Sequence, residues 1–87
     1  MALLDLLGRR WALRVIWELR AGPLAFRPLQ AACGTSPSVL NTRLAELREA
    51  GIVELGDDGY RLSGEGHRLL ETLLPLVNWA ERWAKRS

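Results

Sequence analysis

One helix in this sequence is bounded at both ends, and it constrains the fold more than any other feature. Ser36 is a favoured N-cap, and Pro37 stands in the first helical position, where a missing N–H costs nothing. Gly51 follows the helix and suits the left-handed conformation that ends many helices. Three leucines at helical spacing predict its buried face: Leu40, Leu44 and Leu47. Residues 36–50 are therefore predicted to form a helix with one side in a core and the other outside it.

A β-hairpin is predicted directly after this helix. Residues 52–55 and 60–62 are short apolar runs suited to strands, and the Gly-Asp-Asp-Gly segment at 56–59 supplies a tight turn between them. The preceding Leu24 is expected to pair briefly as a strand. The glycines around the hairpin, at positions 56, 59, 64 and 66, are expected to be turn residues.

Apolar side chains at helical spacing predict four more helices, over residues 2–7, 11–20, 26–32 and 64–86. In the second of them one face gathers the expected core residues Ala12, Val15, Ile16 and Leu19. Ser63 is the expected N-cap of the last helix. Pro75 should kink that helix, because proline has no N–H for the carbonyl four residues earlier.

This order of elements is typical of a winged helix-turn-helix domain that carries an extra C-terminal helix. The fold class is therefore mainly α with a small β-hairpin wing. A chain of 87 residues has room for one compact domain, so residues 1–87 are expected to form a single DNA-binding unit. The helices at 2–7 and 64–86 lie outside the helix-turn-helix and the wing, and we expect them to form the dimer interface.

Composition excludes several other classes of protein. No apolar run approaches the roughly 20 residues that a bilayer requires, so no membrane partner is expected. The single Cys33 excludes an intramolecular disulfide, and one histidine cannot complete a metal site. His67 with Glu65 and Glu71 lacks a nucleophile at any recognisable spacing, so we expect neither an enzyme nor a cofactor. No leader segment is readable, which favours the cytoplasm.

The charges are unevenly distributed along the chain. Residues 8–43 contain six arginines and one acid, whereas residues 44–87 contain eight acids and six basic residues. Arginine suits phosphates and base edges through its planar fork, although genomic base composition can produce the same bias. The first part of the chain is therefore the expected DNA-binding part.

The outer side of the 36–50 helix has the residue types of a major-groove reader. Ser38 and Thr42 point most directly away from the leucine face, Asn41 flanks them with Ala45, and Arg43 lies on the other shoulder. No acid occurs in residues 36–43, which fits approach to a phosphate backbone. Asn41 could read adenine and Arg43 guanine. The alternative is that these polar residues only cap and solubilise the helix.

The sequence resembles the HxlR-type family of MarR-like winged-helix regulators. The resemblance is carried by residues 7–13 (LGRRWAL), 22–29 (GPLAFRPL), 36–47, 50–54 (AGIVE) and 60–63 (YRLS) leading to Gly66. It implies a homodimer that binds a pseudo-palindromic operator and alters transcription nearby. Family members commonly have a cysteine shortly before the Gly-Lys-Trp segment that residues 8–11 resemble, and some use it as a redox or electrophile sensor. No cysteine precedes Gly8 here, so sensing by that route is not expected, and Cys33 is expected to be a buried small apolar residue.

Two sets of site residues are predicted. The DNA-binding set is Arg27, Ser36, Pro37, Ser38, Asn41, Thr42, Arg43 and Arg61. Because the acidic wing tip at 57–58 would be repelled by a minor groove, any wing contact should come from Arg61 to phosphate. The dimer set lies on the two terminal helices, since interfaces favour tryptophan and the last helix has more apolar width than one small domain can cover: Leu3, Leu4, Leu7, Leu74, Val77, Trp79 and Trp83.

A second class of function remains open. The acidic wing tip also suits a winged-helix module that serves only protein-protein assembly and does not bind DNA. No polar cluster marks a pocket for a small-molecule effector.

Overall fold

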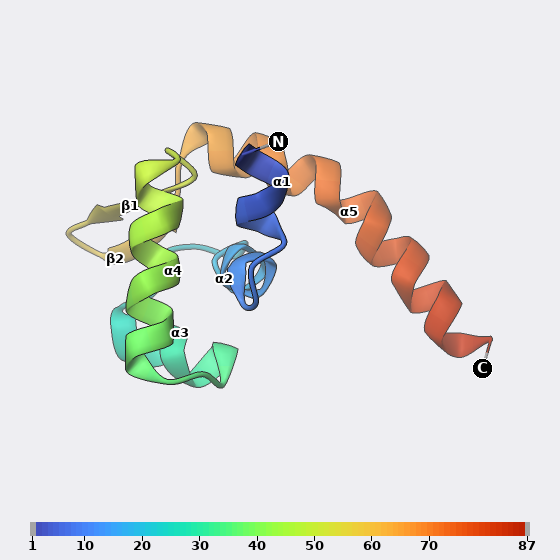
Figure 1. Cartoon of the computed structure of the whole chain (residues 1–87), viewed down its shortest axis with the longest axis horizontal. Helices are drawn as coiled ribbons and strands as arrows, with labels where there is room; N and C mark the ends of the chain where they lie inside the picture. Colours follow the sequence, from blue (N-terminus) through green and yellow to red (C-terminus); the bar gives the residue numbers. More distant parts are fainter. Residues whose placement is uncertain (1, 87) are drawn as a thin grey trace.

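The computed structural model describes residues 2–86, which form a small helical domain with one hairpin and a projecting last helix (Figure 1). The elements in chain order are α1 (Ala2–Leu7), α2 (Ala12–Glu18), α3 (Phe26–Cys33), α4 (Pro37–Glu49), β1 (Val53–Gly56), β2 (Gly59–Leu62) and α5 (Gly64–Lys85). This order confirms the predicted fold class. Among residues 2–86, no helix combines the length and apolarity that crossing a bilayer requires.

The core lies where α2, α3, α4 and the hairpin meet. The predicted stripes of α2 and α4 are buried, with Leu40 and Leu47 fully enclosed and Leu44 nearly so. Leu29 from α3 and Leu62 from β2 complete the same cluster. Burial of several large aliphatic side chains, each worth about 1.5–3 kcal/mol, fixes α4 against this core and leaves its other side outside.

The ends of α4 form as the sequence predicts. The Ser36 hydroxyl accepts a hydrogen bond from the Val39 amide at 3.3 Å, and Pro37 occupies the first turn. Gly51 has a left-handed φ of 77°, which stops the helix, and its amide donates to the Arg48 carbonyl. The Ile52 amide donates to the Leu47 carbonyl, so the chain enters the wing in a fixed direction.

The wing is an antiparallel pair of β1 and β2 that closes at residues 57–58. Val53 pairs with Leu62 and Gly56 with Gly59, so the first strand lies one residue later than predicted and the second begins one residue earlier. Leu24 exchanges backbone hydrogen bonds of 2.8 and 2.9 Å with Tyr60, as the predicted brief strand. The wing is thereby tied to the segment that precedes α3.

Helix α2 is shorter than the predicted 11–20. Trp11 adopts a left-handed φ of 77° and lies outside the helix. At the other end, the Arg20 and Gly22 amides bond carbonyls only three residues back, at Trp17 and Leu19. These tight turns end the helix at Glu18, earlier than predicted.

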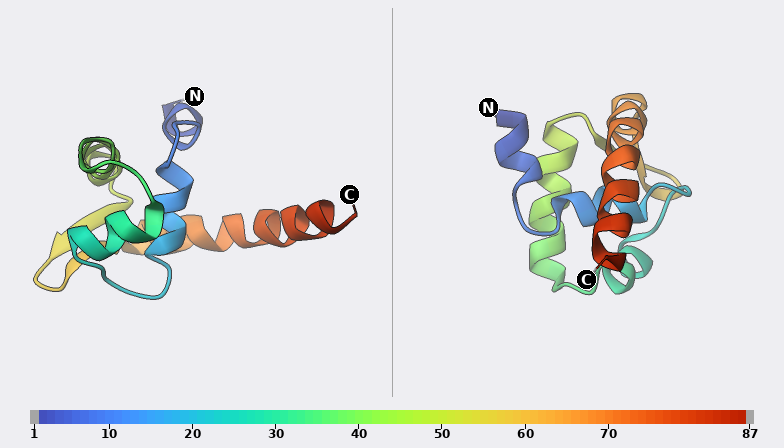
Figure 2. Two further views of the ribbon diagram at one scale, coloured as in Figure 1. Left: turned by 90° about the horizontal axis from the view of Figure 1, so that it is seen from below. Right: turned by 90° about the vertical axis from the view of Figure 1, so that its right-hand side faces the viewer.

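Helix α5 begins at Gly64, after its N-cap Ser63, and projects away from the domain in its second half (Figures 1 and 2). The Ser63 hydroxyl accepts from the Gly66 amide at 3.0 Å, as expected of an N-cap. Gly64 and Gly66 belong to the first turn of the helix, so their prediction as turn residues was wrong. Figure 1 shows α5 changing direction partway along, and Pro75 lies near its middle.

Candidate nucleic-acid interface

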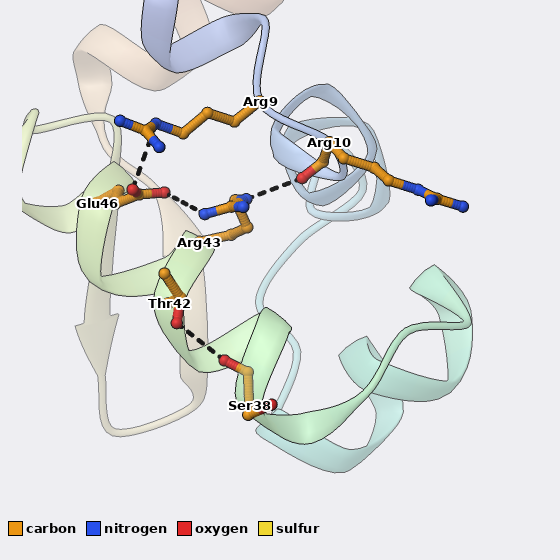
Figure 3. A network of polar contacts seen from close by, with 6 residues as sticks. All are labelled: Arg9, Arg10, Ser38, Thr42, Arg43 and Glu46. Carbon is orange, nitrogen blue, oxygen red and sulfur yellow. Dashed lines mark hydrogen bonds and ion pairs between the residues drawn. The ribbon is translucent and has the colours of Figure 1, made fainter.

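The outer side of α4 is exposed along its first two turns. Ser38, Asn41 and Thr42 all face solvent there, as predicted. The Thr42 hydroxyl donates to the Ser38 carbonyl at 3.0 Å, so it has lone pairs left to accept further hydrogen bonds (Figure 3). The Ser36 and Ser38 hydroxyls lie 3.5 Å apart at the start of the helix. This surface offers small hydrogen-bonding groups without a carboxylate.

A shallow hollow lies between α3 and the start of α4. Arg27, Gln30 and Pro37 line this hollow together with Phe26 and Ala31. Arg27 and Pro37 are exposed. A cationic side chain therefore stands next to the N-terminal end of α4, where the helix dipole also favours negative charge.

Arg43, which was predicted to contact guanine, forms its hydrogen bonds within the domain in this structure. Its Nε donates to the Arg10 carbonyl at 2.8 Å, and its Nη1 binds Glu46 Oε1 at 2.7 Å (Figure 3). The side chain is only 18% exposed. The guanidinium thus faces the linker between α1 and α2, because a backbone carbonyl and a carboxylate occupy its fork there. Arg43 does not extend the exposed surface formed by Ser38, Asn41 and Thr42.

A second arginine joins the same group of side chains. Arg9 Nε lies 3.3 Å from Glu46 Oε2, so one carboxylate bridges two arginines. We call Arg9, Arg10, Arg43 and Glu46 the linker cluster. Sequence reasoning missed it, although the i,i+3 spacing of Arg43 and Glu46 was a signal that their charges could pair.

Arg61 is exposed on the wing but already has an anionic partner. Its Nε lies 2.9 Å from Glu54 Oε1 on the facing strand. This hydrogen bond, with the charges of Glu54, Asp58 and Asp57, raises the pKa of Arg61. A phosphate would have to share or replace Glu54 as its partner.

The predicted dimer residues fall into two groups. Trp79 and Trp83 stack on the second half of α5 with ring centroids 6.2 Å apart, and more than half of each is exposed. Leu74 is exposed near the middle of α5, and Val77 is half-buried towards α2. On α1, Leu3 and Leu4 are exposed, whereas Leu7 packs against the core. Leu3 borders the first half of α5, through a hollow shared with Leu69 and Thr72.

Cys33 ends α3 inside the core, as expected of a small apolar residue. It is 4% exposed and belongs to the main hydrophobic cluster. Burial raises the pKa of its thiol, the charge of Glu18 raises it further, and Arg14 acts in the opposite direction. The thiolate that attacks disulfides and electrophiles is therefore disfavoured at neutral pH.

We expect Cys33 to react with a water-soluble aromatic disulfide at pH 7 on the order of 100-fold more slowly in the folded protein than in urea. Because the pKa is raised in the folded state, the folded thiol should also need a higher pH to gain reactivity. Release of the coloured thiol, followed by absorbance, measures both rates. Equal rates with and without urea would show that the sulfur is accessible.

His67 and its acidic neighbours are not part of a metal-binding cluster among residues 2–86. No group of three histidine, cysteine, aspartate or glutamate side chains is close enough to hold a metal ion there. Glu65, which the sequence places near His67, pairs with Arg68 at 2.7 Å. That hydrogen bond lowers the pKa of Glu65. The carboxylate is thus a stabilised anion at the start of α5.

A supporting helix, a second helix with an open polar side and a β-hairpin wing together define a winged helix-turn-helix protein. The chain belongs to the HxlR-like helix-turn-helix family, whose model matches residues 6–87. This family consists of DNA-binding regulators of transcription rather than enzymes.

Relatives support the same assignment. The uncharacterized HTH-type transcriptional regulator YvaP of Bacillus subtilis is 30% identical, over 95% of this chain and 84% of YvaP. Quinone-bound YodB from B. subtilis has a TM-score of 0.85 and 30% identity, and 93% of each chain is covered. A candidate HxlR family transcriptional factor from Thermoplasma volcanium has a TM-score of 0.83 and 26% identity, over 94% of this chain and 81% of the other.

Proposed function

We propose that this regulator binds a pseudo-palindromic operator as a homodimer, with α4 in the major groove of each half-site. Residues 1–87 form one DNA-binding unit in this proposal, and α1 and α5 form the dimer seam. The observation that carries it is the exposed outer side of α4, which presents Ser38, Asn41 and Thr42 without a carboxylate. A carboxylate at this position would be repelled by the phosphates on either side of the groove.

The contacts divide into base readers and phosphate binders. Asn41 can bond the N6 and N7 edge of adenine, and Ser38 and Thr42 can bond either base edges or phosphates. Ser36 and Pro37 approach the backbone at the start of the helix, where Arg27 adds positive charge. Arg61 binds a phosphate from the wing after its ion pair with Glu54 is broken. Arg43 is left out of the contact set, because its fork is bonded to Arg10 and Glu46.

The dimer proposal rests on apolar surface that the chain itself leaves uncovered. Leu74, Trp79 and Trp83 are exposed on a helix that projects beyond the core. A two-fold partner would cover them, and two-fold symmetry would present two α4 helices to half-sites about 34 Å apart. We also propose that the protein is located in the cytoplasm, where the DNA of a bacterial regulator lies.

Selection from a random duplex pool tests DNA binding directly. The protein should enrich one two-fold-related sequence, and its affinity should fall steeply between about 50 and 200 mM salt, because phosphate contacts release counterions. Failure to enrich any sequence, with no salt-dependent binding, would support the assembly-only module instead.

We expect Asn41→Ala to weaken binding to the selected operator by about 1–3 kcal/mol, a tenfold to hundredfold loss. The loss should be smaller on an operator altered at the base pair that Asn41 reads. Fluorescence anisotropy with labelled duplexes measures both affinities. Asn78→Ala, the same change on the polar face of α5, is the matched control and should leave affinity unchanged. Equal affinities for wild type and Asn41→Ala would remove Asn41 from the interface.

A further inference from the structure

Helix α4 is fastened to the linker between α1 and α2 by the linker cluster. Figure 3 shows Arg43 reaching from α4 to the linker backbone, while Arg9 reaches back from the linker to Glu46. Two contacts therefore join the linker to α4, one from Arg43 to the Arg10 carbonyl and one from Arg9 to Glu46. Within α4, Arg43 and Glu46 are bonded to each other. Two attachment points fix rotation as well as distance, which a single bond would not do.

The geometry of Arg43 suits this role. One guanidinium uses Nε for the Arg10 carbonyl at 2.8 Å and Nη1 for Glu46 Oε1 at 2.7 Å. A lysine ammonium is a point donor on a flexible stem and would not reproduce this fixed fork. Burial adds to the effect, because the side chains of Arg43 and Glu46 are 18% and 26% exposed and water competes less for them than at the surface.

The linker cluster lies between the two parts that the proposed function must coordinate. Before it comes α1, which has no buried residue and is held on the domain mainly by half-buried Leu6 and Leu7. On its other side is α4, whose neighbouring face carries Ser38 and Thr42 (Figure 3). A shift of the linker would therefore be passed to the helix that is proposed to read DNA.

We propose that Arg43 and Glu46 are positioning residues that set the orientation of α4 relative to α1. In the dimer, they would thereby set the separation of the two α4 helices on the operator. This inference rests on the proposed function. It assigns Arg43 to specificity for half-site spacing rather than for a base.

Glu46→Gln gives a test in which electrostatics and positioning predict opposite signs. Loss of a carboxylate from α4 should strengthen DNA binding, because one repulsion with the phosphates disappears. Loss of the bridge to Arg9 and Arg43 should instead weaken operator binding, by about fivefold or more. Glu49→Gln is the matched control, since Glu49 is an exposed glutamate one turn from Glu46. We expect Glu49→Gln to bind the operator as tightly as wild type or more tightly.

Arg43→Lys provides a second test at constant charge, with Arg48→Lys as its control on the exposed side of α4. Each variant is titrated with the selected operator and with operators whose half-sites are moved closer or farther by one base pair. Wild type and Arg48→Lys should prefer the selected spacing strongly. Arg43→Lys should lose about tenfold on the selected spacing and much less on the altered ones, and its base preference within a half-site should not change.

The outcomes separate the two proposals. Wild-type protein that binds no duplex would contradict the proposed function. A second outcome would overturn the positioning role alone. In it, wild type binds its operator, Glu46→Gln binds as tightly as Glu49→Gln, and Arg43→Lys keeps the spacing preference. Loss of base preference at one G·C pair in Arg43→Lys would also overturn it, in favour of direct guanine reading. Binding of each variant to a scrambled duplex at low salt that is no weaker than that of wild type verifies that its fold and basic surface are intact.

Discussion

Gly66→Ala should destabilise the protein by about 3 kcal/mol, although alanine is the better helix former. Gly66 is buried in the first turn of α5, and a Cβ there would collide with the Ile52 carbonyl oxygen. That carbonyl cannot move away freely, because it accepts hydrogen bonds from the Ser63 amide at 2.9 Å and the Ser63 hydroxyl at 3.1 Å. The new methyl group would therefore break the N-cap of α5 or push the helix off the wing.

Thermal unfolding followed by circular dichroism measures this effect. For a domain of this size, about 3 kcal/mol corresponds to a fall in Tm of roughly 15 °C. Gly64→Ala is the matched control, because Gly64 is exposed in the same turn and an added Cβ would meet only the end of Arg68 at 3.7 Å. That change should be neutral or stabilising by up to about 1 kcal/mol. Equal melting temperatures for the two variants would show that the close approach to Ile52 is unimportant.

The contrast between these glycines illustrates what the sequence could reveal. The core face of α4 and its Ser36 cap were predictable, because helical periodicity and N-capping depend on residues within a few positions of each other. The segment around Gly64 and Gly66 has the composition of a turn. A glycine is required at position 66 because the helix approaches Ile52, which belongs to the segment before the wing. No local sequence pattern predicts such a contact.

Arg43 shows the same limit in the candidate site. Its angle on the helix places it at the shoulder of the outer face, from which it could turn towards DNA or towards the domain. The Arg10 carbonyl decides its direction, and Arg10 lies 33 positions earlier in the chain. That carbonyl belongs to a linker whose last residue, Trp11, has a left-handed backbone. Helical periodicity cannot predict a non-glycine residue in this conformation.

The exposed polar residues of α4 were easier to predict than the arginines around them. Ser38, Asn41 and Thr42 are short, so their helix positions nearly determine where their polar groups lie. Arginine side chains are long enough to reach neighbouring elements, and five ion pairs in residues 2–86 involve an arginine. A count of arginines therefore overestimates the positive charge available to DNA, as Arg43 and Arg61 both show.

Replacing both tryptophans of α5 by alanine should convert the protein to a monomer and weaken operator binding by at least about 100-fold. Trp79 and Trp83 are 53% and 54% exposed, so their own chain leaves about half of each side chain uncovered. Tryptophans that become buried at an interface commonly cost 2 kcal/mol or more when truncated. Two of them stacked at 6.2 Å act as one surface, so the losses need not add.

Sedimentation velocity over a range of protein concentrations measures the association, and anisotropy measures binding to a full operator and to a single half-site. The double tryptophan variant should sediment as a monomer and lose affinity for the full operator, while its weak affinity for one half-site should remain that of wild type. Asn78→Ala with Arg82→Ala changes two exposed polar residues of the same helix and should leave both properties unaltered. A double tryptophan variant that still dimerises and binds the full operator normally would show that the dimer interface lies elsewhere.

Because a dimer stabilises its folded subunits by mass action, melting temperatures must be compared at equal protein concentration.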